Sequence, residues 1–205
     1  MSIKKSFICA ALAASAFAAQ ASNLVVNGSF EQVASGNSQA SGTWGIYNSI
    51  TGWTGIPNIE VRDNVAGAAQ NGSNYVELDT NNNSGMFQVI NGNGLFNLSF
   101  WYSPRERVAA GSNGIGFNFG SLSGQVLANV AGAPSGNVWQ QYTALVNLNG
   151  PTALMFFGTG RSDSLGGSLD NVSVTAVPEP ESYAMMLAGL GLMGAIARRR
   201  KSKAA

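Results

Sequence analysis

Residues 95–102 read Leu-Phe-Asn-Leu-Ser-Phe-Trp-Tyr, and this stretch decides the fold class. Its even-numbered residues, from Phe96 to Tyr102, are all large and apolar, while Asn97 and Ser99 fall between them. Alternation with a period of two is typical of a β-strand that turns one face towards a core. The stretch therefore predicts a strand, and its even-numbered side chains should be buried.

Similar alternation lies on both sides of this segment. We expect further strands at residues 24–30, 58–62, 75–79, 86–90, 113–120, 125–130, 142–148, 153–157 and 170–174. Clusters of Asn, Gly and Ser at residues 81–85 and 91–94 predict turns between strands. No helical pattern longer than two turns interrupts the series. The sequence thus predicts an all-β protein with a single antiparallel β-sandwich at residues 22–176.

Composition excludes several kinds of chemistry. The chain has 205 residues, no His and one Cys, which removes His-based catalytic triads, most zinc sites and an internal disulfide. The formal charge is +1, but most basic residues lie at the two ends of the chain. Residues 22–176 keep four Arg against eight acidic residues, a net charge of −4. An acidic domain is a poor partner for nucleic acid, so we expect none.

The first 21 residues have the pattern of a secretory signal peptide. Lys4 and Lys5 precede a largely apolar run at residues 7–19, and Ala19-Gln20-Ala21 forms a cleavage site of small residues. We expect cleavage after Ala21, which would also remove the single cysteine. The protein is therefore predicted to be exported.

Residues 177–205 have the pattern of a second sorting element. Pro178-Glu179-Pro180 precedes an apolar stretch at residues 183–197, and Arg198-Arg199-Arg200 follows it. About 15 helical residues rise roughly 22 Å, short of the ~30 Å hydrocarbon core unless the flanking side chains snorkel. With that help we expect a C-terminal transmembrane helix, whose basic end stays in the cytoplasm.

This order of motif, Gly-rich apolar helix and Arg cluster resembles the PEP-CTERM sorting signal of Gram-negative bacteria. The resemblance implies that an exosortase, a membrane protease-transpeptidase, recognises Pro178, Glu179 and Pro180. It also implies a transient inner-membrane intermediate and then release to the cell surface or extracellular matrix. Proteins with this signal usually occur in bacteria that make exopolysaccharide and biofilm.

The two ends of the central domain carry a second resemblance. Residues 23–31 read Asn-Leu-Val-Val-Asn-Gly-Ser-Phe-Glu, and residues 167–174 read Gly-Ser-Leu-Asp-Asn-Val-Ser-Val. Together with residues 72–79 they resemble galactose-binding-like jelly rolls, a group that includes several families of carbohydrate-binding modules. The resemblance implies a jelly-roll fold, but this fold hosts many unrelated binding roles.

Asp170 is the most informative single residue of the domain. Strand parity places it on the same side as Val172 and Val174, at the rim of an apolar layer. A carboxylate there needs hydrogen-bond donors or a cation. The jelly-roll resemblance implies a structural Ca²⁺ with Glu31 and Asp170 among its ligands, and oxygen ligands suit Ca²⁺. Hydrogen bonds within a turn are the alternative.

Four residues are candidates for contact with a glycan. Trp44, Tyr47 and Trp53 lie in an early Gly- and Ser-rich loop region, and their rings could stack on sugars. Trp44 and Tyr47 are favoured, because their segment lacks strand alternation. Arg105 follows the longest predicted strand and could bind sugar hydroxyls. The alternatives are a core position for each Trp and an exposed loop tip for Arg105.

These observations favour a non-enzymatic surface or matrix protein that associates with exopolysaccharide. A purely structural or adhesive matrix component without a glycan site is the first alternative. A polysaccharide-active enzyme is the second, because Glu60, Glu77, Asp79 and Asp163 could provide paired carboxylates. Ser29 and Ser162 have no base partner, so a serine hydrolase is not expected.

Overall fold

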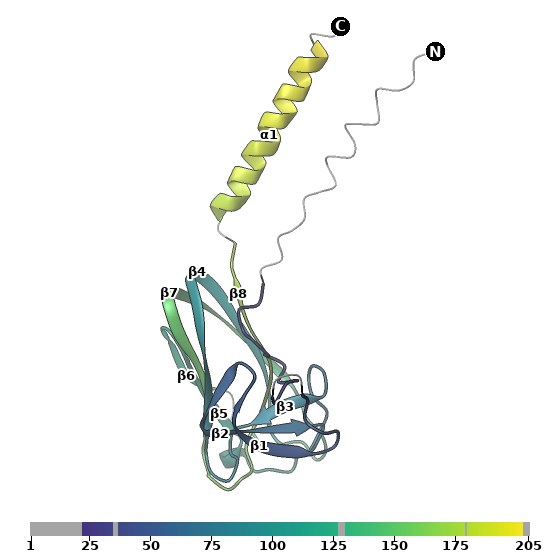
Figure 1. The fold of residues 1–205 in the computed structure, drawn as a ribbon, viewed down its shortest axis with the longest axis vertical. Helices are drawn as coiled ribbons and strands as arrows, with labels where there is room; N and C mark the ends of the chain where they lie inside the picture. Colours follow the sequence, from purple (N-terminus) through teal and green to yellow (C-terminus); the bar gives the residue numbers. More distant parts are fainter. Residues whose placement is uncertain (1–21, 35–36, 127–129, 179, 203–205) are drawn as a thin grey trace, which may run out of the picture.

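The computed structural model describes residues 22–34, 37–126, 130–178 and 180–202, so the predicted signal peptide lies outside the described residues. Within them the chain forms the strands and helices drawn in Figure 1. The strands are β1 (Trp44–Ile50), β2 (Trp53–Asp63), β3 (Asn74–Glu77), β4 (Gly85–Ser103), β5 (Gly114–Phe119), β6 (Leu122–Val126), β7 (Gln140–Thr159) and β8 (Ser168–Ala176). The helices are a short 3₁₀ turn, η1 (Ala110–Ser112), and the C-terminal α1 (Pro180–Ser202).

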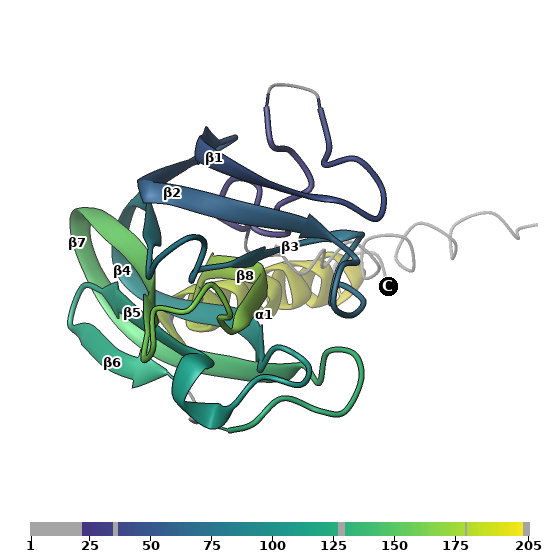
Figure 2. The ribbon, with the colours of Figure 1, turned by 90° about the horizontal axis from the view of Figure 1, so that it is seen from below.

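The strands form an antiparallel β-sandwich of the jelly-roll type, which confirms the predicted fold class. Neighbouring strands follow the order β1-β2-β3-β8-β4-β7-β5-β6, and β2 also pairs with the start of β4. Long strands therefore take part in both layers. The first layer contains β1, β3, β8 and one half each of β2, β4 and β7, and the second contains the other halves with β5 and β6. Figure 2 shows the two groups of strands from below.

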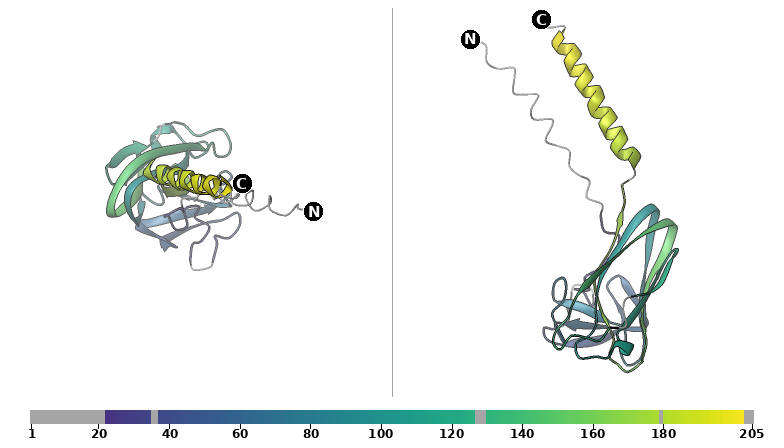
Figure 3. Two further views of the ribbon diagram at one scale, coloured as in Figure 1. Left: turned by 90° about the horizontal axis from the view of Figure 1, so that it is seen from above. Right: turned by 180° about the vertical axis from the view of Figure 1, so that it is seen from behind.

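A single bent ribbon of β4 and β7 joins the layers, and Figure 3 shows it as a tall arch. The two strands stay paired from Gly85↔Phe157 to Tyr102↔Gln140 without interruption. The predicted turn at residues 91–94 is therefore wrong, because these residues continue β4. Gly92 pairs directly with Gly150 at the bend, where a Cβ on Gly92 would lie 2.6 Å from the Phe96 ring. Asn-Gly pairs in a sequence usually indicate turns. Here the two glycines carry no side chain at the bend, which lets the ribbon fold over its own core.

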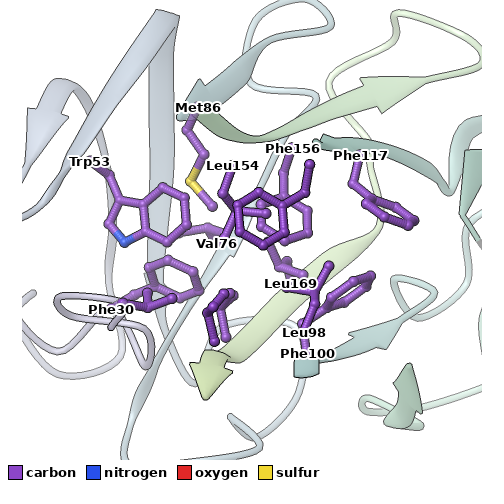
Figure 4. Close-up of a cluster of buried hydrophobic side chains, with 14 of the residues drawn as sticks. Phe30, Trp53, Val76, Met86, Leu98, Phe100, Phe117, Leu154, Phe156 and Leu169 are labelled. Carbon is purple, nitrogen blue, oxygen red and sulfur yellow. The ribbon is translucent and has the colours of Figure 1, made fainter. Parts of the chain in front are cut away.

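The core fills the space between the layers, as Figure 4 shows. Phe100 lies near its centre, with ring centroids 4.9 Å from Tyr142 and 5.0 Å from Phe156. The even-numbered residues predicted from the opening stretch are all buried, from Phe96 to Tyr102. Burial of each large apolar side chain contributes about 1.5–3 kcal/mol, so this cluster is the main source of stability.

Three further strand predictions need correction. Residues 24–30 form no strand, because residues 26–29 make a turn and only Asn23 bridges to Thr175. The early segment expected to lack strand structure forms β1. Strand β6 ends at Val126, and residues 127–129 of the predicted strand lie outside the described residues.

The sorting segment follows β8 directly. Pro178 is exposed, Pro180 begins α1, and Arg198, Arg199 and Arg200 lie exposed near its end, whereas Glu179 lies outside the described residues. The prediction of a transmembrane helix is not supported. In the part of the chain that the structure describes, no helix combines the length and the apolar character that crossing a membrane requires.

Candidate functional site

The side of the first layer that faces away from the core carries several buried polar side chains, and we call it the outer face. Cross-strand pairing aligns its residues in rows, and one row runs Ile46, Glu60, Glu77, Ser168 and Ser103. The outer face also carries Trp44 of β1, Arg62 of β2, Tyr75 of β3, Trp101 of β4, Gln141 of β7 and Asp170 of β8.

Asp170 reaches the outer face through a bulge in β8. Ser173 pairs with Ser99 and Asp170 with Trp101, so three steps along β8 match two steps along β4. The extra residue falls at Asn171, whose φ is 49°. Such a bulge reverses the side on which later side chains lie. Asp170 therefore lies opposite to Val172 and Val174, and the predicted parity is wrong although its burial was expected.

Asp170 and Glu31 hold the segment 70–74 from two sides. The backbone N–H groups of Gln70 and Asn71 donate to Asp170 Oδ2 at 2.8 and 2.9 Å. The N–H groups of Ser73 and Asn74 donate to Glu31 Oε1 at 3.0 and 2.9 Å. The structure thus brings together the two acidic residues that the sequence proposed as a pair, although they lie far apart along the chain.

The electrostatics of this carboxylate pair, Glu31 and Asp170, are unfavourable without a cation. Burial raises the pKa of Asp170 to about 7, and the nearby Glu31 charge acts in the same direction. Hydrogen bonds from the N–H groups of Asn71, Asn171 and Gln70 only partly oppose this rise. Two acids that accept only N–H and O–H donors would gain from a divalent cation.

The donor set at this pair fits Ca²⁺, which prefers carboxylate, amide and carbonyl oxygens. Asn74 is buried, and its Oδ1 has no hydrogen-bond partner although its own N–H binds Glu31. Among the described residues, no three His, Cys, Asp or Glu side chains cluster as a metal site. A cation at Glu31 and Asp170 would therefore need backbone or amide oxygens as its other ligands.

Glu77 is the centre of a buried ion-pair network in the middle of the outer face. Its carboxylate lies 2.9 Å from Arg62 Nε and 3.0 Å from an Arg105 nitrogen, and it accepts the Gly166 N–H at 2.7 Å. Arg62 also pairs with Glu60. Burial raises the pKa of Glu77 to about 7 against the opposing charges of Arg62 and Arg105. The network ties β2, β3 and two loops together, which is a structural role.

The predicted glycan contacts do not form one site. Trp44 is 55% exposed on the outer face, whereas Tyr47 pairs with Ile59 and packs on the core side of the same strand. Trp53 is 2% exposed and contacts Phe30 and Phe156, so its indole offers no face to a glycan.

Arg105 is bound to both carboxylate oxygens of Glu77 and to the Ser164 carbonyl. It is therefore a fixed member of the ion-pair network and not the exposed loop tip of the alternative interpretation.

The acids considered for glycoside hydrolysis are poorly placed for a substrate. Glu60, Glu77 and Asp79 are 4%, 0% and 1% exposed, and Glu60 and Glu77 are engaged by arginines. Asp163 is exposed and accepts a hydrogen bond from Ser112. Loops cover Glu77 and Asp79, which accept backbone N–H groups of Asp163, Leu165 and Gly166.

Sequence reasoning missed Trp101 and the exposed part of the outer face on β7. The outward side chains there are Gln141, Thr143, Leu145, Asn147 and Asn149. All five are exposed and none is charged. Their odd-numbered alternation was visible in the sequence, but the predicted break near residue 150 hid its length.

Comparisons with known proteins agree with the sorting element. Residues 176–201 match the PEP-CTERM protein-sorting motif. The chain carries this motif, which implies export, processing by an exosortase and sorting to the cell surface. This confirms the predicted identity of the C-terminal segment.

Matches to the domain itself are more distant. The multifunctional-autoprocessing repeats-in-toxin of Vibrio vulnificus is 32% identical over 159 residues, which are 75% of this chain but only 3% of that protein. Structural neighbours include TmCBM61 in complex with β-1,4-galactotriose (TM-score 0.47, 14% identity, 76% of this chain and 99% of that one) and a family 16 carbohydrate-binding module (0.47, 14%, 75% and 100%). A family 35 module from Clostridium thermocellum has a TM-score of 0.42 at 16% identity, over 66% of this chain and 99% of that one.

Proposed function

We propose that the jelly-roll domain binds extracellular polysaccharide through its outer face and has no catalytic role. The observation that carries this proposal is the row of five exposed, uncharged outward side chains on β7, rich in Asn, Gln and Thr. Amide and hydroxyl groups can exchange hydrogen bonds with sugar hydroxyls in both directions. A neutral face on a domain of net charge −4 favours a neutral glycan.

The dimensions of the face favour a polymer over a single sugar. Trp44 lies on β1 at one edge, and the uncharged row lies on β7, five strands away in the sheet order. With neighbouring strands about 4.8 Å apart, the two regions are roughly 24 Å apart. The Trp44 ring offers a stacking surface at the far edge, and Trp101, half-buried beside Gln141, offers a second one near the row.

Binding of the purified full-length protein to a panel of neutral and acidic bacterial polysaccharides tests this proposal. We expect Trp44→Ala to weaken binding by about tenfold, equivalent to about 1.4 kcal/mol. Thr143→Glu should weaken binding more than Trp44→Ala does, because it places a charge in the uncharged row. Val89→Ala is the matched control, because Val89 is 52% exposed but pairs with Ala153 beyond the bend, in the other layer.

Failure of the wild-type protein to bind any polysaccharide would refute glycan recognition. The structural or adhesive alternative would then stand, since it needs no glycan site. Release of reducing sugar from a bound polysaccharide would instead contradict the non-enzymatic role.

We also propose a structural Ca²⁺ at Glu31 and Asp170, whose role would be to fix the segment 70–74 against β8. The support is that the buried Asp170 and the half-buried Glu31 lie near each other, and their hydrogen bonds come from N–H and O–H groups of residues 70–74 and 171 and not from a basic side chain. Measurement of glycan binding with and without EDTA shows whether the fixed position of segment 70–74 is needed for glycan recognition.

Sorting can be tested separately from binding. Deletion of residues 178–180 should leave full-length precursor in the cell, detected by its mass, because the exosortase would lack its motif. Normal processing of that variant would contradict the sorting role, whatever the domain binds.

A further inference from the structure

The loop between β3 and β4 contains two buried side-chain oxygens without partners. Asp79 is 1% exposed, and its Oδ1 accepts no hydrogen bond. Asn83 Oδ1 is also buried and unpartnered. A buried carboxylate or amide oxygen normally has a donor, because leaving it unpaired costs about 1–3 kcal/mol. Both oxygens therefore need a ligand that the protein itself does not supply.

The two side chains lie on the same side of the loop. Asp79 and Asn83 are partners in an isolated antiparallel bridge. Directly opposed residues of this kind have Cβ atoms about 4.5–5.5 Å apart on one face. An ion or small molecule between them could thus contact both side chains.

The segment 160–165 fixes the orientation of both groups. Asp79 Oδ2 accepts the N–H groups of Asp163 and Leu165 at 2.8 and 3.3 Å, which leaves Oδ1 as the free oxygen. Asn83 Nδ2 donates to the Gly160 carbonyl at 3.1 Å. The opposite amide orientation would place an oxygen against that carbonyl, so Oδ1 is assigned by the hydrogen bond.

The local charge favours a cation. Among the described residues, the ion pairs join Arg62 and Arg105 to Glu60 and Glu77, and none includes Asp79. Asp163 adds a second carboxylate from the neighbouring segment, with one oxygen accepting from Ser112. Carboxylate and amide oxygens without nitrogen or sulfur donors are typical ligands of Ca²⁺.

The sequence of the loop supports the same assignment. Asp79-x-Asn81-x-Asn83 has the spacing of the first, third and fifth ligands of a calcium-binding loop. The loop departs from the helix-flanked type, since Ser84 replaces the usual glycine and no Glu lies at the twelfth position, which is Ile90. Its remaining ligands would come from residues 160–165, or from water.

We propose that this loop binds a Ca²⁺ ion, with Asp79 and Asn83 as side-chain ligands and Asp163 in reach. The site is separate from the carboxylate pair, because the two lie at opposite ends of β3, and Asn74 and Asp79 are roughly 16 Å apart along an extended chain. Its cation would tie the β3–β4 loop to the segment 160–165 that precedes β8.

Calorimetric titration of chelator-treated full-length protein with Ca²⁺ tests the proposal. Asp79→Asn should weaken one binding event by about tenfold or more, because ligand charge sets the affinity of such sites. Asn83→Asp should strengthen the same event by about tenfold, since it adds a carboxylate. Asp170→Asn is the matched control, because it should leave this event unchanged.

Two results would overturn the proposal. One is a titration in which the wild-type protein and Asp79→Asn bind Ca²⁺ identically. The other is a Ca²⁺ affinity of Asn83→Asp that is lower than or equal to that of the wild-type protein. That result would indicate that a water molecule links the two oxygens. Asn83→Asp keeps the test decisive if Asp79→Asn does not fold. Glycan binding is measured independently, so its failure is distinguishable from failure of this site.

Discussion

Replacement of Asp170 by Asn should remove a pH-dependent destabilisation of the cation-free protein. Asp170 is fully buried, and its pKa rises from 3.8 to about 7, mainly through burial and with a contribution from Glu31. A group with a raised folded-state pKa stabilises the fold below its unfolded pKa and loses that contribution as pH rises through the folded value. For Asp170 the loss should occur between about pH 4 and pH 7.

The magnitude follows from the size of this shift. About three pKa units at about 1.4 kcal/mol each give a loss of about 4 kcal/mol by pH 8. Asp170→Asn carries no charge at any pH, so its stability should lack this component. The free energy of unfolding of Asp170→Asn should instead be lower by about 1–3 kcal/mol at every pH, because its Nδ2 faces a backbone N–H group whose hydrogen bond the carboxylate accepts.

Urea unfolding of both proteins in EDTA, from pH 4 to pH 8, provides the measurement. The stability of the wild-type protein minus that of Asp170→Asn should fall by about 4 kcal/mol over this range. Glu106→Gln is the control, since Glu106 lies on a loop away from the carboxylate pair. If the proposed Ca²⁺ binds there, a concentration one hundred times its Kd should stabilise the wild-type protein at pH 8 by about 2.7 kcal/mol more than it stabilises Asp170→Asn.

Parallel stability profiles of the wild-type protein and Asp170→Asn would refute this reasoning. They would show that Asp170 ionises as readily in the folded protein as in the unfolded chain. A profile difference combined with the same response to Ca²⁺ in both proteins would support the burial argument but contradict the cation at Glu31 and Asp170.

Three further variants test the packing and the ion pairs. Gly150→Ala should cost about 1–3 kcal/mol in urea unfolding, because Gly150 has φ of 102° at the bend of the ribbon, whereas Gly111→Ala, equally free of contacts but without a positive φ, should be nearly neutral. Glu77→Gln should cost about 3–5 kcal/mol at pH 8, measured by chemical unfolding, because it leaves buried arginines without their carboxylate. Trp53→Ala should lower the free energy of unfolding by about 3–5 kcal/mol, and any glycan binding should change only with loss of fold.

The architecture of the first layer was largely predictable, and the ribbon was not. Alternation identified the strands around residues 96–102 and 142–148 because their core-facing positions are large and apolar. The same signal fails at Gly92 and Gly150, since glycine provides no apolar side chain and Asn-Gly pairs are common in turns. Only the uninterrupted pairing with β7 distinguishes a bent strand from a hairpin.

The candidate site shows the same division. Sequence resemblance paired Glu31 with Asp170, and the structure places both against one loop. The β8 bulge at Asn171 could not be found from alternation, because one added residue reverses the parity of the strand. The different environments of Trp44 and Tyr47 could also be assigned only from the sheet. The exposure of each ring depends on which face of β1 its side chain occupies.

By itself the sequence determined the fold class and the PEP-CTERM sorting motif, because these depend on local patterns and short motifs. Tertiary structure alone decided which polar residues are buried and which share a site. Burial on the outer face depends on loops that return from distant parts of the chain, such as residues 70–74 against Asp170 and residues 160–165 against Asp79. Such contacts depend on the path of the whole chain, so they cannot be predicted from a local pattern of residues.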